Sequence, residues 1–139
     1  MALKLSLRPG EKFVINGAVL QNGDRRAILM LQNKASILRE KDIMQSTEAN
    51  TPARRIYFPV MMMYIAPIES DLYYQNFMER LHEFMGVLRN PLIIKECISL
   101  SRDVAAKDFY RALQRCRKLM AYEGERLGHV HSSLSEDGE

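Results

Sequence analysis

The chain has 139 residues, of which 47% are hydrophobic and 27% are charged, and its formal net charge is +3. This size and composition predict one globular domain, or one domain with a small appended lobe, and so weak a net charge does not by itself indicate a nucleic-acid partner. No apolar run approaches the roughly 20 residues that cross a bilayer, and no signal peptide is visible, so we expect a cytoplasmic protein.

Residues 1–43 predict an antiparallel β subdomain of about five short strands. Turn signals interrupt runs of apolar and β-branched residues, and Asn16-Gly17 is typical of a tight hairpin because both residues tolerate positive φ. The expected strands are residues 2–7, 12–15, 18–21, 25–31 and 35–39. The fourth strand contains Ala27-Ile28-Leu29-Met30-Leu31, which does not alternate, and this predicts cover on both of its faces.

Residues 52–123 predict a helical subdomain of three or four helices, joined to the strands by a polar linker at 44–51. Apolar stripes and capping signals place the helices at 53–66, 71–89, 91–100 and 104–122, with Asp103 as the last N-cap. Pro59 leaves a strand at 60–65 as an alternative. The acidic tail, 124–139, is expected to fray or be disordered. Strands followed by helices indicate an α+β fold.

Enzyme activity is not expected, because no nucleophile, metal or nucleotide motif is present. His82 lies on the polar face of a predicted helix, and His129 and His131 lie in the acidic tail. Cys97 and Cys116 stand within apolar patterns and are expected to be reduced, buried thiols. We therefore expect neither a cofactor nor a metal.

Basic side chains flank the predicted strands and are candidates for contact with RNA. They are Lys4 and Arg8 at the first strand, Arg25 and Arg26 after the central turn, and Arg39 and Lys41 at the last strand. The planar guanidinium of arginine suits both phosphates and base edges. The alternative interpretation is that these are solvated edge residues, which discourage strand-on-strand aggregation.

Three further patterns leave alternatives open. Arg111, Arg115 and Lys118 share one face of the last predicted helix, either as a secondary basic site or as a solvated face. Arg54 and Arg55 in a first helical turn oppose the helix dipole, which hints at an acidic ligand or partner. The consecutive residues Met61, Met62 and Met63 suit either a core or an adaptable interface.

The stretches LKLSLRPGEKFVINGAV, GDRRAILMLQNKASILREKDIM and FMGVLRNP resemble the FlbT family of flagellin regulators. The resemblance implies a repressor that binds the 5′ untranslated leader of flagellin mRNA and promotes its degradation, although the sign of regulation varies among members. It also implies the flagellar protein FlaF as a partner. The alternative is an adaptor or chaperone-like module that binds flagellin or FlaF without contacting RNA.

The N-terminal part is more distantly similar to the CsrA regulators of RNA, through Arg8-Pro9-Gly10-Glu11 and Leu38-Arg39-Glu40. This resemblance implies a five-stranded, CsrA-like sheet, a homodimer, and RNA contacts at Leu5, Arg8, Leu38 and Arg39. The chain departs from that family at Leu7, where CsrA proteins carry a basic residue, so the RNA motif that CsrA prefers does not transfer directly.

Overall fold

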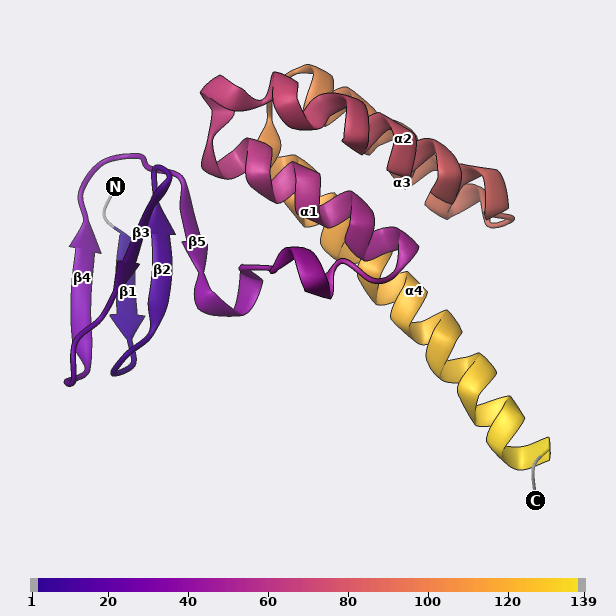
Figure 1. The fold of residues 1–139 in the computed structure, drawn as a ribbon, viewed down its shortest axis with the longest axis horizontal. Helices are drawn as coiled ribbons and strands as arrows, with labels where there is room; N and C mark the ends of the chain where they lie inside the picture. The colour runs from indigo at the N-terminus through magenta and orange to yellow at the C-terminus, as the bar shows by residue number, and fades with distance from the viewer. Residues whose placement is uncertain (1–2, 138–139) are drawn as a thin grey trace.

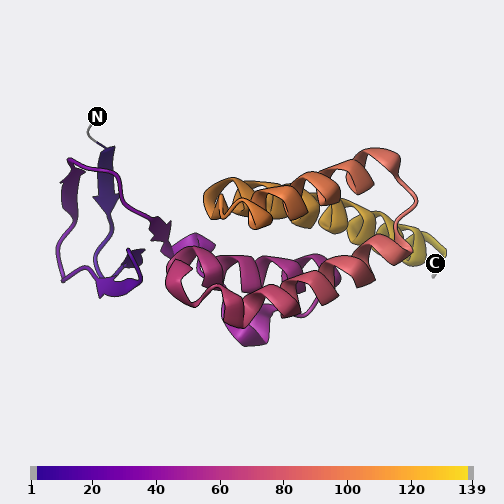
Figure 2. The ribbon, with the colours of Figure 1, turned by 90° about the horizontal axis from the view of Figure 1, so that it is seen from above.

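The computed structural model describes the backbone of residues 3–137 and the side chains of residues 3–126. Within these residues, five strands precede four α helices, which confirms the α+β prediction. The strands stand at one end of an elongated molecule and the helices extend away from them (Figures 1 and 2). None of the described helices combines the length and apolar composition that a membrane span requires.

The strands lie close to their predicted positions and form two small antiparallel sheets. They are β1 (Leu3–Leu7), β2 (Lys12–Ile15), β3 (Ala18–Gln21), β4 (Ala27–Leu31) and β5 (Ile37–Arg39). One sheet pairs β1 with β4, and the other has the order β3-β2-β5. The β2–β3 turn has positive φ at Asn16 (49°) and Gly17 (83°), as the Asn-Gly signal predicts for a type I′ hairpin.

The expected burial of β4 on both faces is wrong. Ile28, Leu29 and Met30 are 57%, 41% and 53% exposed. The reason is topological, since β4 pairs with β1 alone and none of its described side chains joins the helical core. A continuous apolar run predicts two covered faces only for an internal strand, whereas β4 is an edge strand.

The first helix, α1 (Pro52–Ile65), continues through Pro59, which excludes the strand alternative. It begins as predicted, with the Thr51 hydroxyl accepting a hydrogen bond from the Arg54 backbone N–H at 3.2 Å. The 3₁₀ turns η1 (Glu40–Asp42) and η2 (Ser46–Glu48) precede it, and η3 (Pro67–Glu69) leads into α2 (Asp71–Val87).

The boundary between the last two helices lies later than predicted. Helix α3 (Pro91–Ala105) contains Asp103, and α4 (Phe109–Asp137) begins after Lys107, whose φ is 60°. Asp108 is the actual cap, since its carboxylate accepts from the Arg111 N–H at 3.2 Å. The backbone of α4 also continues past the end predicted at residue 122, while residues 138 and 139 of the expected tail lie outside the described residues.

The core lies between the helices, with α1 packed against α2 and α4, and α3 packed against α4. Met61 and Met63 are buried in this core, so the methionine run serves packing within the chain. Cys97 and Cys116 are free, buried thiols, as expected. Burial raises the pKa of Cys97 to about 11 and that of Cys116 further still.

The β subdomain is fixed to the end of α1 by two close approaches. The Tyr64 hydroxyl donates to the Ile37 carbonyl at 2.9 Å and accepts from the Ile37 N–H at 2.8 Å, which holds β5. Gly17 lies so close to α1 that a Cβ there would stand 2.9 Å from the Ile65 carbonyl oxygen. The hairpin turn therefore requires glycine both for its φ and for its contact with the helix.

Candidate nucleic-acid interface

Arg8 and Arg39 converge on the buried carboxylate of Glu11. The Arg39 guanidinium donates to Glu11 Oε2 through Nη2 at 2.9 Å and through Nε at 3.2 Å. The Arg8 backbone N–H donates to the other carboxylate oxygen, Oε1, at 2.9 Å. The turn after β1 and the end of β5 are thereby tied together, although the two strands belong to different sheets.

These contacts determine the electrostatics of the pair. The Arg8 backbone N–H, and then the Arg39 side chain, lower the pKa of Glu11, so the carboxylate stays ionised. Arg39 also donates to the Ser6 carbonyl at 2.6 Å, which fixes its guanidinium on two sides. Arg8 is held more loosely, at 3.7 Å from a Glu40 oxygen, and 67% of its side chain is exposed. Arg39 is therefore held by short hydrogen bonds on two sides, whereas the exposed Arg8 side chain makes only longer ion pairs, at 3.6 Å with Glu11 and at 3.7 Å with Glu40.

A second turn brings Arg25 and Arg26 beside Arg8. The Asn22 side-chain amide donates to the Arg8 carbonyl at 2.8 Å and to the Arg25 carbonyl at 2.9 Å. The Gly10 N–H also donates to the Gly23 carbonyl at 2.9 Å. In Figure 1, β1 and β5 end and β4 begins on the same side of the β subdomain, and the four arginines stand at or next to these strand ends in the chain. We call this set, Arg8, Arg25, Arg26 and Arg39, the arginine end.

The remaining candidates of the β subdomain lie elsewhere. Lys4 is exposed on β1 opposite Met30, away from the arginine end, and Lys41 is exposed in η1. Leu5 and Leu38 are only 5% and 2% exposed. Their side chains are part of the packed interior, as the alternation of leucines along β1 indicates. Contact of these two side chains with RNA, which the CsrA resemblance implies, is not available in this conformation.

The basic face of α4 is occupied by ion pairs within the chain. Arg115 pairs with both Asp103 and Glu96 of α3, Lys118 lies 3.8 Å from Glu96, and Arg111 lies 3.8 Å from Asp108. Arg115 thereby joins α3 to α4 and is compensated by two acids, whereas Arg111 and Lys118 stay 66% and 65% exposed beside more distant carboxylates. The structure favours the solvated-face alternative here.

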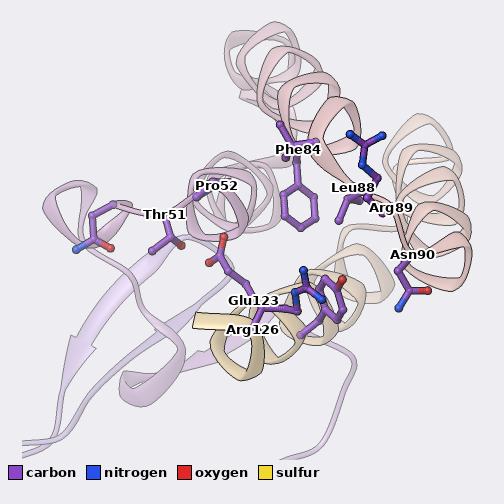
Figure 3. A pocket seen from close by; sticks show the side chains of 11 residues that line it. Thr51, Pro52, Phe84, Leu88, Arg89, Asn90, Glu123 and Arg126 are labelled. Atoms are coloured by element: carbon purple, nitrogen blue, oxygen red, sulfur yellow. The ribbon is translucent and has the colours of Figure 1, made fainter. Parts of the chain in front are cut away.

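An acid of the chain itself stands at the helix start that holds Arg54 and Arg55. The Glu123 carboxylate of α4 accepts the Ala53 N–H at 2.9 Å and so supplies negative charge to the start of α1. Beside it lies a cavity of about 690 Å³, where the ends of the helices meet (Figure 3). Arg89 and Arg126 line this cavity together with apolar Phe84 and Leu88, a grouping that no local motif of the sequence predicts.

Sequence reasoning also missed a groove between the β subdomain and the start of α4. Its lining includes Lys34, Tyr110 and Arg117, together with Lys4 and Arg39 from the predicted set. These residues come from segments far apart in the chain, so only the docking of β5 on α1 brings them together. Among the described residues, no group of three or more His, Cys, Asp or Glu side chains is arranged to hold a metal ion.

The family model described as "Flagellar protein FlbT" matches residues 3–127 of the chain. The "Flagellum biosynthesis repressor protein FlbT" of Caulobacter vibrioides (strain ATCC 19089 / CIP 103742 / CB 15) is 60% identical over 139 residues, which cover 100% of this chain and 99% of the relative. The "Probable flagellum biosynthesis repressor protein FlbT 1" of Bradyrhizobium diazoefficiens is 34% identical over 134 residues, covering 96% and 90%. No solved structure matches the chain.

Proposed function

This chain belongs to the FlbT family, and we propose that it regulates flagellum biosynthesis by binding the 5′ untranslated leader of flagellin mRNA and promoting degradation of that message. Its relatives are named flagellum biosynthesis repressors, which supports a regulatory role in flagellum synthesis and the direction of that role. The names of these relatives do not specify a target molecule, so binding to RNA is the more specific claim of the proposal.

The arginine end is the observation that carries this proposal. Arg8, Arg25 and Arg26 are exposed on two turns that hydrogen bonds join, and Arg39 is fixed beside them by Glu11. Arg25 and Arg26 have no acidic partner among the described residues. Arginine binds phosphate and guanine edges bidentately, and a preorganised guanidinium loses less entropy on binding.

The mechanism follows from what each side chain can reach. Arg8, which is 67% exposed, and Arg39, which Glu11 holds in place, contact bases or phosphates, while Arg25, Arg26, Lys4 and Lys41 attract the backbone. Single-stranded loops are the preferred targets because their bases are accessible, whereas the major groove of duplex RNA is deep and narrow. Binding remodels or covers the leader, and cellular nucleases then make the cut.

The test is binding of the purified chain to a flagellin leader RNA across a salt series. The variant Arg8→Gln/Arg25→Gln/Arg26→Gln leaves Glu11 and Arg39 in place, and Arg55→Gln/Lys95→Gln/Arg102→Gln removes three exposed charges elsewhere as a control. We expect the first variant to bind at least tenfold more weakly and to lower the salt slope by about 0.7 for each phosphate that it no longer neutralises. Equal weakening in the two variants, or no binding by the natural chain at low salt, contradicts the proposal.

The uncovered strand β4 favours a second property, a homodimer. Its five residues are apolar, its outer edge pairs with no strand among residues 3–137, and two copies placed about a twofold axis can pair antiparallel along it. We expect Ile28→Lys to lower the molar mass measured by light scattering from that of a dimer to that of a monomer. A natural chain that is monomeric at high concentration refutes the dimer and leaves β4 open to a different protein, such as FlaF or flagellin.

A further inference from the structure

The groove between the β subdomain and α4 is large enough for a ligand and continuous with the arginine end. Its volume is about 750 Å³, within the range of about 300–1,000 Å³ that is usual for ligand sites. Arg39 belongs to both, because it lines the groove and also contacts Glu11. Lys4, on the groove, lies in β1, and Arg8, at the arginine end, follows the last residue of β1 four positions later, which is about 13 Å along an extended chain.

Two tyrosines give the groove one rigid and one exposed aromatic ring. Tyr64 is 7% exposed, and its hydroxyl is fixed to Ile37. Tyr110, in the first turn of α4, is 60% exposed, and its ring centre lies 6.3 Å from that of Tyr64 at an angle of 47°. Tyr110 therefore lies against a fixed ring while most of its surface stays exposed, and an exposed aromatic ring can serve as a surface on which an unpaired base stacks.

The free charge of the groove is positive. It is lined by the cations Lys4, Lys34, Arg39 and Arg117 and by the acids Asp42 and Asp108. Arg117 lies 3.2 Å from Asp42, and Asp108 is engaged as the cap of α4 and with Arg111. Lys4 and Lys34 have no acidic partner in the described part of the chain. Two ammonium groups without an acidic partner among the described residues thus line the same groove as the exposed ring.

We propose that this groove holds one unpaired RNA base stacked on Tyr110, with the neighbouring phosphates bound by Lys4 and Lys34. The inference rests on the proposed RNA-binding function and extends it to a second contact, on the helical side of the molecule. A base on an aromatic ring between cations is how proteins bind single-stranded nucleic acid, and the stack tolerates any base because each has a π face. An RNA strand lying along β1 then reaches both contacts.

Variants of Tyr110 test the stack directly. We expect Tyr110→Ala to weaken binding to the flagellin leader RNA about tenfold, which is about 1.4 kcal/mol, without changing the salt slope. Tyr110→Phe keeps the ring and should bind within twofold of the natural chain. Tyr74→Ala removes another exposed tyrosine, on α2, and should bind normally. Tyr110→Leu keeps an apolar contact with Tyr64 but has no π face, so it serves if the alanine variant unfolds.

Two further measurements distinguish direct RNA contact from a purely structural role of the groove residues: the salt dependence of lysine variants and a cross-link to the RNA. Lys4→Gln and Lys34→Gln should each lower the salt slope by about 0.7 and leave thermal unfolding unchanged. Leader RNA made with 4-thiouridine should cross-link under near-ultraviolet light to a peptide that contains Tyr110.

The possible outcomes distinguish a failure of the proposed stacking site from a failure of the proposed RNA-binding function. If the natural chain binds and the arginine variant weakens while Tyr110→Leu binds normally, the groove is not an RNA site and the proposed function stands. If the natural chain does not bind the leader at low salt, both are overturned. If free uridine monophosphate competes fully with the leader, the groove is a mononucleotide site and the extended contact along β1 is wrong.

Discussion

Replacing Gly17 with alanine should loosen the docking of the β subdomain on α1, and the chain contains a matched control. Gly17 has a φ of 83° and Gly10 has a φ of 73°, so alanine meets similar backbone strain at both positions. A Cβ at Gly10 meets no atom within 4 Å, whereas at Gly17 it lies 2.9 Å from the Ile65 carbonyl oxygen. The difference between the two variants therefore isolates the contact between the hairpin and the helix.

The magnitudes follow from these two geometries. The left-handed conformation costs alanine about 1–2 kcal/mol, which is the whole expected effect at Gly10. The contact at Gly17 must open from 2.9 Å toward the 3.4 Å of an ordinary contact, and overpacking of this kind adds about 1–3 kcal/mol. A chain of this size loses about 3 °C in Tm for each kcal/mol, so we expect decreases of about 3–6 °C at Gly10 and about 6–15 °C at Gly17.

Calorimetry and denaturant unfolding measure both variants, and hydrogen exchange locates the effect. We expect Gly17→Ala to speed exchange of the Ile37 N–H, which the Tyr64 hydroxyl protects. Equal destabilisation by the two variants contradicts the reasoning, because it means that the turn moves freely away from α1.

Three other outcomes follow from single contacts. Tyr64→Phe removes the partner of both the N–H and the carbonyl of Ile37, and it should cost about 1–3 kcal/mol in the free energy of unfolding, measured in urea. At pH 8 the thiols of Cys97 and Cys116 should react with a thiol reagent only as the chain unfolds, because burial excludes the reagent and raises both pKa values; rapid labelling of the native chain argues against this packing. The pKa of Glu11 lies below its ordinary value of 4.5, so its contribution to stability is complete above that pH and is lost as pH falls through the folded pKa. The advantage of the natural chain over Glu11→Gln in urea should accordingly shrink on acidification below about pH 4.5, and an advantage that is constant with pH contradicts this assignment.

Local patterns predicted most of the elements of this fold. The Asn-Gly turn, the alternating leucines of β1 and the helical stripes act over a few residues. They placed the strands and the starts of α1, α2 and α3 to within two positions, but not the end of α4, which lies at Asp137 rather than at residue 122. The break between α3 and α4 was misplaced because Asp103 and Asp108 are both suitable caps. In the structure Asp108 caps α4, while Asp103 is engaged with Arg115 in a contact that crosses from one helix to the next.

Long-range pairing accounts for the features that sequence reasoning missed. The exposure of β4 depends on which strand it pairs with, and residue patterns do not specify this. The arginine end was anticipated as a set of residue types, but the hydrogen bonds by which Glu11 and Asn22 hold it together were not predicted. The groove around Tyr110 was missed altogether, because β1, the chain before β5, α1 and α4 all contribute to it.

The position of the two proposed contacts has a thermodynamic consequence. The arginine end lies wholly within the β subdomain, whereas the groove needs β1 and β5 on one side and Tyr110 of α4 on the other. An RNA strand that occupies both binds only when the β subdomain is docked on α1, so binding must stabilise the docked state. Tyr64 contributes to this coupling from both sides, since its hydroxyl holds β5 and its ring supports Tyr110. Recognition of the message and the joining of the two subdomains are then one linked equilibrium.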